Sequence, residues 1–283
     1  MAILSVQSSV AYGCVGNAAA VFALRRSGHE VWPVDTVRFS NHPGHGHFRG
    51  RRVGAEEIAD LILGLADLGV LARTEAVLSG YLGAVAIGPV VLDAVARVRA
   101  GNPRAVFFCD PVLGDRDCGL YGAGDLVRFF RDEALPAADI VSPNHFELEV
   151  LAGRTLPTVD TVLAAVDDLA ARGPQTVLVT SVVDGAGYPG RIATIARDRS
   201  GTWQVITPML PHPGRGAGDL LAALFLGRRL DGRPTADALS LAVSSVFAVI
   251  EATAAAGADE LLLVASQQAL VDPPMAFAAE RIR

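Results

Sequence analysis

Short apolar segments alternate with longer helical patterns along most of the 283 residues, and this alternation constrains the fold more than any other feature. Short apolar runs predict strands, whereas apolar residues that recur every 3.6 residues or so predict helices. Strands that alternate with helices favour a mostly parallel sheet with helices on both faces, which is the α/β class. The predicted strands are Ile3–Gln7, Val31–Asp35, Ala76–Ser79, Val106–Cys109, Ile140–Ser142 and Val177–Thr180, and the predicted helices are Asn17–Ser27, Ala55–Leu68, Gly88–Arg99, Asp125–Ala134 and Val159–Arg172.

The pattern changes in the last third of the chain. Two apolar runs, Ile192–Ala196 and Trp203–Thr207, are separated by a polar turn and predict a hairpin. The remainder is mostly helical. The predicted elements there are helices at Leu220–Arg229, Ala236–Ala255 and Ser266–Val271, with a strand at Leu261–Val264. No linker or internal repeat interrupts the pattern, so we expect one domain, residues 1–283.

Composition excludes several classes of protein. A formal net charge of −6 argues against a nucleic-acid binder, which needs a basic face. Cys14, Cys109 and Cys118 are odd in number and irregularly spaced, so they predict neither a disulfide framework nor a zinc site. No uninterrupted apolar run approaches the ~18 residues of a membrane span, and the first residues lack the basic segment of a secretory signal. We therefore expect a cytoplasmic protein without a membrane partner.

A glycine-rich motif stands directly before a strongly apolar helix. Residues 213–219 read Pro-Gly-Arg-Gly-Ala-Gly-Asp and run straight into the apolar residues 220–225. Glycine lets an anion approach the main chain closely, and the free N–H groups and dipole at a helix start favour negative charge. An acid at Asp219 could accept a proton from a hydroxyl that attacks a phosphate held there. The motif therefore indicates phosphoryl transfer.

The same four residues, Gly-Ala-Gly-Asp, occur a second time at 122–125. The helix predicted after Asp125 is amphipathic and charged, as expected of a surface helix, so Asp125 is interpreted as a helix cap. The helix predicted after Asp219 is apolar all round as far as Gly227, which suits a buried position. A plain helix cap stays open as an alternative for Asp219 as well.

Small polar or acidic residues follow five of the predicted strands. They occur at residues 7–8, 79–81, 110–112, 142–144 and 180–181. In an open α/β sheet, ligands bind beyond the carboxyl ends of the strands. The five strand ends therefore predict one site, in which the loop containing Tyr81 forms a wall.

Two acidic residues in these loops are candidates for holding a metal ion. Asp110 is followed by a proline that favours an extended or turn conformation, and Glu147 lies three residues after Asn144. The Asn-x-x-Glu spacing is that of a helix-capping arrangement, and it also allows Glu147 and Asp110 to hold Mg²⁺ on nucleotide phosphates. Both interpretations can hold together. The glycines and proline of residues 41–48 predict a mobile flap. The three histidines in this segment do not predict a dedicated metal site, because no Cys or acid there completes a set of ligands.

Together these segments resemble those of the pyridoxal (pyridoxamine) kinases of the ribokinase-like superfamily, over nearly the whole chain. Residues 7–17 look like the N-terminal substrate loop of that family, and residues 37–42 look like its second substrate segment. Residues 110–115, 142–147 and 216–219 match its metal, nucleotide and catalytic motifs in order. The glycine–aspartate motif is common to the superfamily, whereas the two substrate segments narrow the match to vitamin B6 kinases.

The resemblance implies a ribokinase-like fold, with a small flap over the substrate site, and a role for each matching residue. Asp219 would be the base for the 5′-hydroxyl, and the amides of Gly216, Ala217 and Gly218 would form the anion hole. Vitamer contacts are implied for Ser8, Val15, Val37, Phe39, His42, Pro43, Gly44, Phe48, Tyr81 and Asp219. Nucleotide contacts are implied for Asp110, Ser142, Asn144, Glu147, Thr180, Ser181, Thr207, Pro208, Met209, Leu210, Gly216 and Gly218. Asp110 and Glu147 would hold Mg²⁺ with ATP, and Asp115 and Ser142 a monovalent cation, K⁺ or Na⁺.

The implied activity is transfer of the γ-phosphate of ATP to the 5′-hydroxyl of pyridoxal, pyridoxamine or pyridoxine, by a homodimer. Two alternatives stay open. One is a kinase of the same superfamily that acts on hydroxymethylpyrimidine or another small alcohol. The other is a weakly active protein that binds and buffers the vitamer; it is motivated by Pro43, where family members often carry threonine, and by Thr180, where many bacterial members carry lysine.

Overall fold

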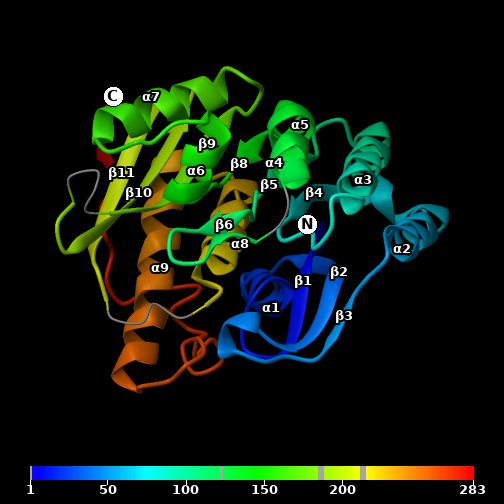
Figure 1. Ribbon diagram of the computed structural model, residues 1–283, viewed down its shortest axis with the longest axis horizontal. Coiled ribbons are helices and arrows are strands. Elements are labelled where there is room, and N and C mark those ends of the chain that lie inside the picture. The colour runs from blue at the N-terminus through cyan, green and yellow to red at the C-terminus, as the bar shows by residue number, and fades with distance from the viewer. Residues whose placement is uncertain (1, 122–123, 184–187, 211–214) are drawn as a thin grey trace.

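One ten-stranded sheet runs through the computed structural model, which describes residues 2–121, 124–183, 188–210 and 215–283 (Figure 1). Its strand order is β12-β11-β10-β9-β8-β5-β4-β1-β2-β3. The parallel strands are β1 (Ala2–Tyr12), β2 (Glu30–Asn41), β4 (Thr74–Ser79), β5 (Val106–Cys109), β8 (Ile140–Val141) and β9 (Thr176–Val182). The antiparallel pairings at the two edges involve β3 (Gly50–Arg52), β10 (Arg191–Asp198), β11 (Gly201–Pro208) and β12 (Glu280–Arg281). The predicted α/β class is confirmed.

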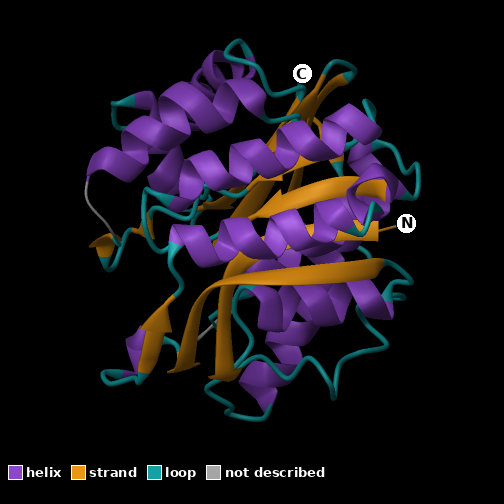
Figure 2. Cartoon of the chain, turned by 90° about the vertical axis from the view of Figure 1, so that its right-hand side faces the viewer, coloured by secondary structure: helices purple, strands orange, loops and turns teal. Residues whose placement is uncertain are grey.

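Helices cover both faces of this sheet (Figure 2). Successive strand residues point to opposite faces, so Phe107 packs into one core and Phe108 into the other. On the Phe107 side lie α2 (Ala55–Asp67), α3 (Ile87–Gly101), α4 (Gly124–Phe129), α5 (Leu135–Ala137), α6 (His145–Ala152) and α7 (Val159–Ala170). On the Phe108 side lie α1 (Asn17–Arg26), α8 (Ala217–Leu230) and α9 (Thr235–Ala255). Apolar surface on both faces is what the continuous apolar strand runs require.

Helix α8 is the buried helix that the sequence predicted. Every residue from Leu220 to Gly227 is buried, because α8 packs against the sheet, α1 and α9. By length and composition, α9 could cross a membrane, with a mean hydropathy of 1.8 over its most apolar window. However, 56% of that window is buried inside the protein, as in the core helix of a folded domain.

Strands β1 and β2 extend beyond their apolar predictions. They continue as far as Tyr12 and Asn41 because their polar ends pair with each other, through Ser9 with Arg38 and Tyr12 with Asn41. These two extensions carry the N-terminal loop and the flap beyond the carboxyl ends of β1 and β2. The helix predicted after Asp125 begins as α4 and continues into a π-helical turn at Phe130–Ala134.

Two predicted elements near the C-terminus are wrong. Residues 261–264 form no strand and residues 266–271 form no helix, since the segment consists of turns and irregular backbone. Its apolar residues Leu261, Leu263 and Leu270 are buried against the α8 side of the core. The apolar pattern in this segment therefore reflects burial and not regular secondary structure.

Candidate functional site

The polar strand ends that the sequence singled out lie in one row at the carboxyl edge of the parallel strands. Backbone hydrogen bonds join them: Asp110 donates to Ser79 (2.8 Å), Ser142 to Cys109 (3.1 Å) and Thr180 to Pro143 (3.1 Å). Two antiparallel steps make β11 run in the same direction as β9. Residues 207–210 at the end of β11 therefore lie at the same edge.

Helix α8 begins at this edge with Gly216, and any other residue at this position would force the neighbouring backbone to move. Gly216 is the N-cap, with a φ of 89°, and a Cβ there would lie 1.8 Å from the carbonyl oxygen of Cys14. The first N–H groups of a helix have no partner within the helix, so the amides that follow Gly216 are free to bind an anion. The predicted anion-hole residues Gly216, Ala217 and Gly218 form this first turn, whereas residues 213–214 of the motif lie outside the described residues.

Asp219 lies in the first turn of α8 and touches the N-terminal loop. The backbone N–H of Gly16 lies close enough to its carboxylate to favour the ionised form, but burial outweighs this effect and raises the pKa of Asp219 to about 6. Gly16 in turn packs on Ser8, since a Cβ at Gly16 would lie 2.1 Å from the Ser8 carbonyl oxygen. The proposed base and the proposed vitamer contact Ser8 are thus brought together.

Three carboxylates share the centre of the site. Asp110 is buried, and its pKa lies well above the usual range because of burial and the nearby negative charges of Glu147 and Asp219. The Ser142 hydroxyl is buried and has no hydrogen-bond partner among the described residues. It nevertheless lies close enough to Asp110 to favour the ionised form of that carboxyl and so to lower its pKa slightly. A concentration of buried negative charge is stabilised by a bound cation, so these residues fit a divalent ion that accompanies a nucleotide.

Glu147 serves as a helix cap as well as lying at this acidic centre. Its carboxylate accepts hydrogen bonds from the N–H groups of Asn144 (2.8 Å), Leu113 (2.8 Å) and Gly114 (3.2 Å). The Asn144 side chain accepts from the Glu147 N–H, which completes the predicted capping box of α6. Burial raises the pKa of Glu147 in spite of these three donors. The capping interpretation is confirmed, and it fixes the loop after Asp110 to the start of α6.

The described part of the chain contains no dedicated metal cage. Within the described residues, no group of three or more His, Cys, Asp or Glu side chains is arranged to hold a metal ion. His42 and His45 of the flap make other contacts: His42 Nδ1 accepts from the Gly44 N–H (3.0 Å), and His45 Nε2 lies 2.6 Å from a carboxylate oxygen of Glu260. Mg²⁺ that is shared with phosphates needs only one or two carboxylates from the protein.

Asp115 is engaged by its own hairpin, which pairs β6 (Gly114–Asp115) with β7 (Gly119–Leu120). Its carboxylate accepts from the N–H groups of Asp117 (3.0 Å) and Cys118 (2.7 Å) and from the Tyr121 hydroxyl. Burial opposes ionisation of Asp115, but these donors outweigh it and lower its pKa. An ionised Asp115 is compatible with a monovalent cation nearby.

The predicted vitamer residues lie on β1, β2 and the segment that follows β2. Val15 and Val37 are buried, and the rings of Phe39 and Phe48 pack with their centroids 4.6 Å apart. Tyr81 is partly buried, and its carbonyl accepts from the Thr36 hydroxyl (2.6 Å). The predicted flap has regular structure: Pro43–His45, including Gly44, form a short 3₁₀ helix that leads to β3.

The predicted nucleotide residues lie at the ends of β8, β9 and β11. Thr180 pairs with Asn144 in a parallel bridge, and Ser181 has a φ of 56°, the one positive φ outside glycine among the described residues. Such backbone strain is found most often at binding and active sites. The remaining nucleotide candidates range from buried Thr207 to exposed Met209, with Pro208 and Leu210 also at least partly exposed.

Sequence reasoning assigned no role to Glu260 and none to the side chain of Arg215. Glu260 is buried against the flap and the N-terminal loop, and Arg215 donates to the Gly44 carbonyl (2.9 Å). Arg215 was noticeable only as a cation within the glycine motif. Glu260 had no local signal at all, because its partners lie near the opposite end of the chain.

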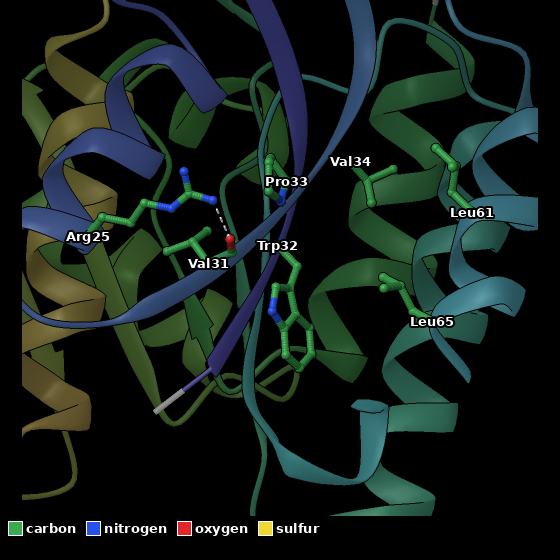
Figure 3. A pocket seen from close by; sticks show the side chains of 7 residues that line it. All are labelled: Arg25, Val31, Trp32, Pro33, Val34, Leu61 and Leu65. Carbon is green, nitrogen blue, oxygen red and sulfur yellow. Dashed lines mark hydrogen bonds between the residues drawn. The ribbon is translucent and has the colours of Figure 1, made fainter. Parts of the chain in front are cut away.

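Two hollows lie away from this edge. One, of about 300 Å³, is lined by Arg25, Trp32 and Leu65 and other residues of β2 and α2, where Arg25 donates to the Val31 carbonyl (2.9 Å; Figure 3). The other, of about 660 Å³, lies at the amino ends of β5, β8 and β9 and includes Arg99 and Arg229. Neither hollow contains a residue of the predicted site.

Comparison with known protein families identifies relatives of this chain. Residues 71–262 match the family described as phosphomethylpyrimidine kinase. The chain is 52% identical to pyridoxal kinase PdxY of Rubrobacter xylanophilus, over 99% of this chain and 97% of that protein. It is 45% identical to pyridoxal kinase PdxY of Corynebacterium diphtheriae, over the whole of both chains.

Solved structures give the same relationship. Pyridoxal kinase from Leishmania donovani, in complex with ADP and pyridoxamine, superposes with a TM-score of 0.93 at 29% identity, covering 100% of this chain and 99% of that one. A putative phosphomethylpyrimidine kinase from Bacteroides thetaiotaomicron, in a crystal form with pyridoxal, gives a TM-score of 0.89 at 26% identity, with 99% of each chain covered. The chain therefore belongs to the phosphomethylpyrimidine kinase family and, within it, to the pyridoxal kinases.

Proposed function

We propose that this protein transfers the γ-phosphate of ATP to the 5′-hydroxyl of pyridoxal, pyridoxamine or pyridoxine and releases the 5′-phosphate and ADP. The observation that carries the proposal is the contact of Asp219 with Gly16, because it joins the base at the anion-binding helix start to the N-terminal vitamer loop. The pyridoxal kinases among the relatives, and the ADP complexes with pyridoxamine and pyridoxine, support the same substrates.

In the proposed reaction, the 5′-oxygen attacks the γ-phosphorus while the bond from that phosphorus to the β,γ-bridging oxygen breaks. Asp219 accepts the hydroxyl proton; with a pKa of about 6 its carboxylate is mostly ionised at neutral pH. The amides of Gly216, Ala217 and Gly218 stabilise the charge on the transferred group. In phosphoryl transfer, such positioning and charge stabilisation supply most of the catalysis.

The acidic centre would hold Mg²⁺ with the nucleotide phosphates. Asp110 and Glu147 are the proposed ligands, acting directly or through water, and the ion would neutralise charge on the phosphates. Asp115 and Ser142 are proposed to hold K⁺ or Na⁺. The ionised state of Asp115 and the buried Ser142 hydroxyl support this assignment.

The two substrates are proposed to approach from opposite ends of the strand row. The vitamer would lie against Ser8 and the β2 side, with His42, Pro43, Gly44 and Phe48 above it and Val15, Val37, Phe39 and Tyr81 as walls. The nucleotide would lie over β8, β9 and β11. Its proposed contacts are Ser142, Asn144, Thr180, Ser181, Thr207, Pro208, Met209 and Leu210, with Gly216 and Gly218 at the phosphates.

A second candidate substrate is hydroxymethylpyrimidine, which the description of the matching family favours. The deciding experiment incubates the protein with ATP, Mg²⁺ and K⁺ and with each of the three vitamers or hydroxymethylpyrimidine, and measures ADP and phosphorylated product together. Product from the vitamers at rates well above that from the pyrimidine supports the proposal. Product from the pyrimidine alone contradicts it, and tight pyridoxal binding without turnover would indicate a buffering protein instead.

The single sheet that runs from β12 to β3 supports one kinase domain over residues 1–283. The resemblance supports a homodimer, which light scattering on the purified protein would test. A cytoplasmic location is proposed for an enzyme that uses ATP and small soluble vitamers, and cell fractionation would test it.

A further inference from the structure

One buried carboxylate bridges the flap and the N-terminal loop. Glu260, which is 9% exposed, follows α9 on a segment that lies against the flap. One of its carboxylate oxygens lies 2.6 Å from His45 Nε2, and the other accepts from the Cys14 N–H (3.3 Å). A Cβ on Gly13 would lie 2.5 Å from the same carboxylate, so the loop is fitted closely around it.

Arg215 makes the matching contact from the catalytic helix. It stands directly before Gly216, its backbone pairs with Glu260 in a parallel bridge, and its guanidinium donates to the Gly44 carbonyl (2.9 Å). A Cβ on Gly44 would lie 2.6 Å from Arg215 Nε. The guanidinium therefore occupies the space that any side chain at position 44 would need.

The electrostatics of the flap agree with this packing. Burial, and then the charge of Arg215, lower the pKa of His42. A neutral His42 ring can accept the Gly44 N–H at Nδ1, as it does in the structure (3.0 Å), whereas a protonated ring could not. Arg215 thus binds the carbonyl of Gly44 directly. It also favours the neutral His42 ring, which binds the N–H of Gly44.

We infer that Glu260 and Arg215 are positioning residues that fasten the flap and the N-terminal loop to the start of α8. We call their contacts with His45, Cys14 and Gly44 the clasp. Because Arg215 directly precedes Gly216, the clasp ties closure over the vitamer to the helix that carries the proposed anion hole. This inference rests on the proposed function for what the flap covers, but the contacts themselves can be tested without activity.

The activity test measures the KM of pyridoxal, the KM of ATP and the ratio of ADP to pyridoxal phosphate formed. A closed flap excludes water, so an open one lets water compete for the phosphoryl group. We expect Glu260→Gln and Arg215→Gln each to raise the pyridoxal KM about tenfold and the ADP-to-product ratio at least twofold, with the ATP KM within twofold. Arg215→Lys should recover part of the loss, because the ammonium can still donate to Gly44.

The second readout is hydrogen exchange of residues 42–48 in the protein without ligands. Exchange there should become at least tenfold faster in Glu260→Gln and Arg215→Gln than in the unmodified protein. Glu251→Gln and Arg49→Gln are matched controls, since Glu251 lies exposed on α9 and Arg49 lies exposed directly after the flap. Both controls should keep unmodified exchange and KM values.

The two readouts separate the clasp from the proposed function. Unchanged exchange at residues 42–48 in both clasp variants overturns the clasp, whatever the activity. So does a vitamer KM equal to that of the control variants. Absence of vitamer phosphorylation by the unmodified protein contradicts the proposed function, while faster exchange in the clasp variants would still uphold the contacts.

Discussion

The backbone N–H of Gly16 lies close to the carboxylate of Asp219, where the N-terminal loop packs against the first turn of α8. Gly16 has a φ of 54° and packs so closely on Ser8 that no side chain fits between them. The position of the base therefore depends on the loop that is proposed to hold the vitamer. Under the proposed roles, the same backbone sets the positions of the vitamer and of the base.

The pKa of about 6 for Asp219 predicts an acid limb in the pH dependence of the reaction. The base must be ionised, so kcat/KM should fall about tenfold per pH unit below about pH 6. The measurement uses both substrates far below their KM values, so that the free enzyme is reported. Vitamers also titrate, so pyridoxal and pyridoxamine are compared. A limb that moves with the vitamer, or that is absent down to pH 4.5 or so, contradicts the assignment to Asp219.

Gly216→Ala should damage catalysis through the backbone. The new Cβ would meet the Cys14 carbonyl oxygen at 1.8 Å, so the first turn of α8 must shift and its amides must leave their positions. Loss of one such donor typically lowers kcat about 100- to 1,000-fold, and we expect that loss with pyridoxal binding changed only a few-fold. Steady-state kinetics and equilibrium binding measure the two effects.

Gly232→Ala is the control for that variant. Gly232 has a similar φ of 81°, but no atom lies within 4 Å of a Cβ placed there. It should therefore carry the same backbone strain without displacing the anion hole. A kcat for Gly216→Ala close to that of Gly232→Ala would remove the Gly216 turn from the mechanism.

Asp110→Asn should stabilise the ligand-free protein while it lowers activity. Burial and the neighbouring carboxylates raise the folded-state pKa of Asp110, so the folded state binds its proton more tightly than the unfolded state. This carboxyl therefore lowers the free energy of unfolding as the pH rises from about 4 through its folded pKa. Thermal melts should show a Tm higher in the variant by roughly 3 °C or more at pH 8, with less difference at pH 5.

Asp115→Asn should behave in the opposite way. Hydrogen bonds lower the pKa of Asp115, so its ionised form stabilises the folded state above the unfolded pKa and that stabilisation is lost as the pH falls. Its removal should lower the Tm at pH 8, and the difference should shrink as the pH falls below about 4 toward its folded-state pKa. A lower Tm for Asp110→Asn at pH 8 would show that the acidic centre is not a source of instability.

The chemistry of the aldehyde product leads to a separate prediction. All 24 residues counted as lysine or arginine are arginines, so the 283 residues offer no side-chain amine. Pyridoxal phosphate forms an imine with an amine by loss of water, and the permanently charged guanidinium of arginine does not react in this way. Incubation with pyridoxal phosphate, borohydride reduction and intact mass measurement should therefore show at most one adduct per chain, at the terminal amine.

Arg104→Lys supplies the positive control for that experiment. Arg104 is exposed, and the structure shows no partner for its guanidinium within the described residues, so a lysine there adds one accessible amine. The variant should gain one adduct. Two or more adducts on the unmodified chain would mean that groups other than amines retain the product.

The elements that position the site could be predicted where the local sequence pattern alone determines the structure that the element adopts in the fold. Helix α8 followed from an unbroken apolar run behind a glycine motif, and the Asn144–Glu147 capping box followed from its spacing. The polar ends of β1 and β2 were not predictable, because only their mutual pairing makes them strands. Residues 261–271 were misassigned because buried turns and regular elements leave the same apolar signal.

Within the candidate site, residues that belong to a local motif could be predicted, whereas the residues that they contact could not. Asp219 could be singled out from its own neighbours, but its approach to Gly16 joins residues from opposite ends of the chain. Glu260 could not be found at all, since its contacts with Cys14 and His45 depend on where the chain returns after α9. Long-range contacts of this kind are fixed by the whole fold and leave no local trace.

The most direct test of the account replaces Asp219 by asparagine and follows transfer of γ-³²P from ATP to pyridoxal. Asparagine keeps the size of the side chain but cannot accept the hydroxyl proton. We expect product formation to fall by at least about 100- to 10,000-fold, the usual contribution of general acid–base catalysis, while pyridoxal binding measured by calorimetry stays within a few-fold. Labelled pyridoxal phosphate formed by Asp219→Asn at the unmodified rate would contradict the central claim.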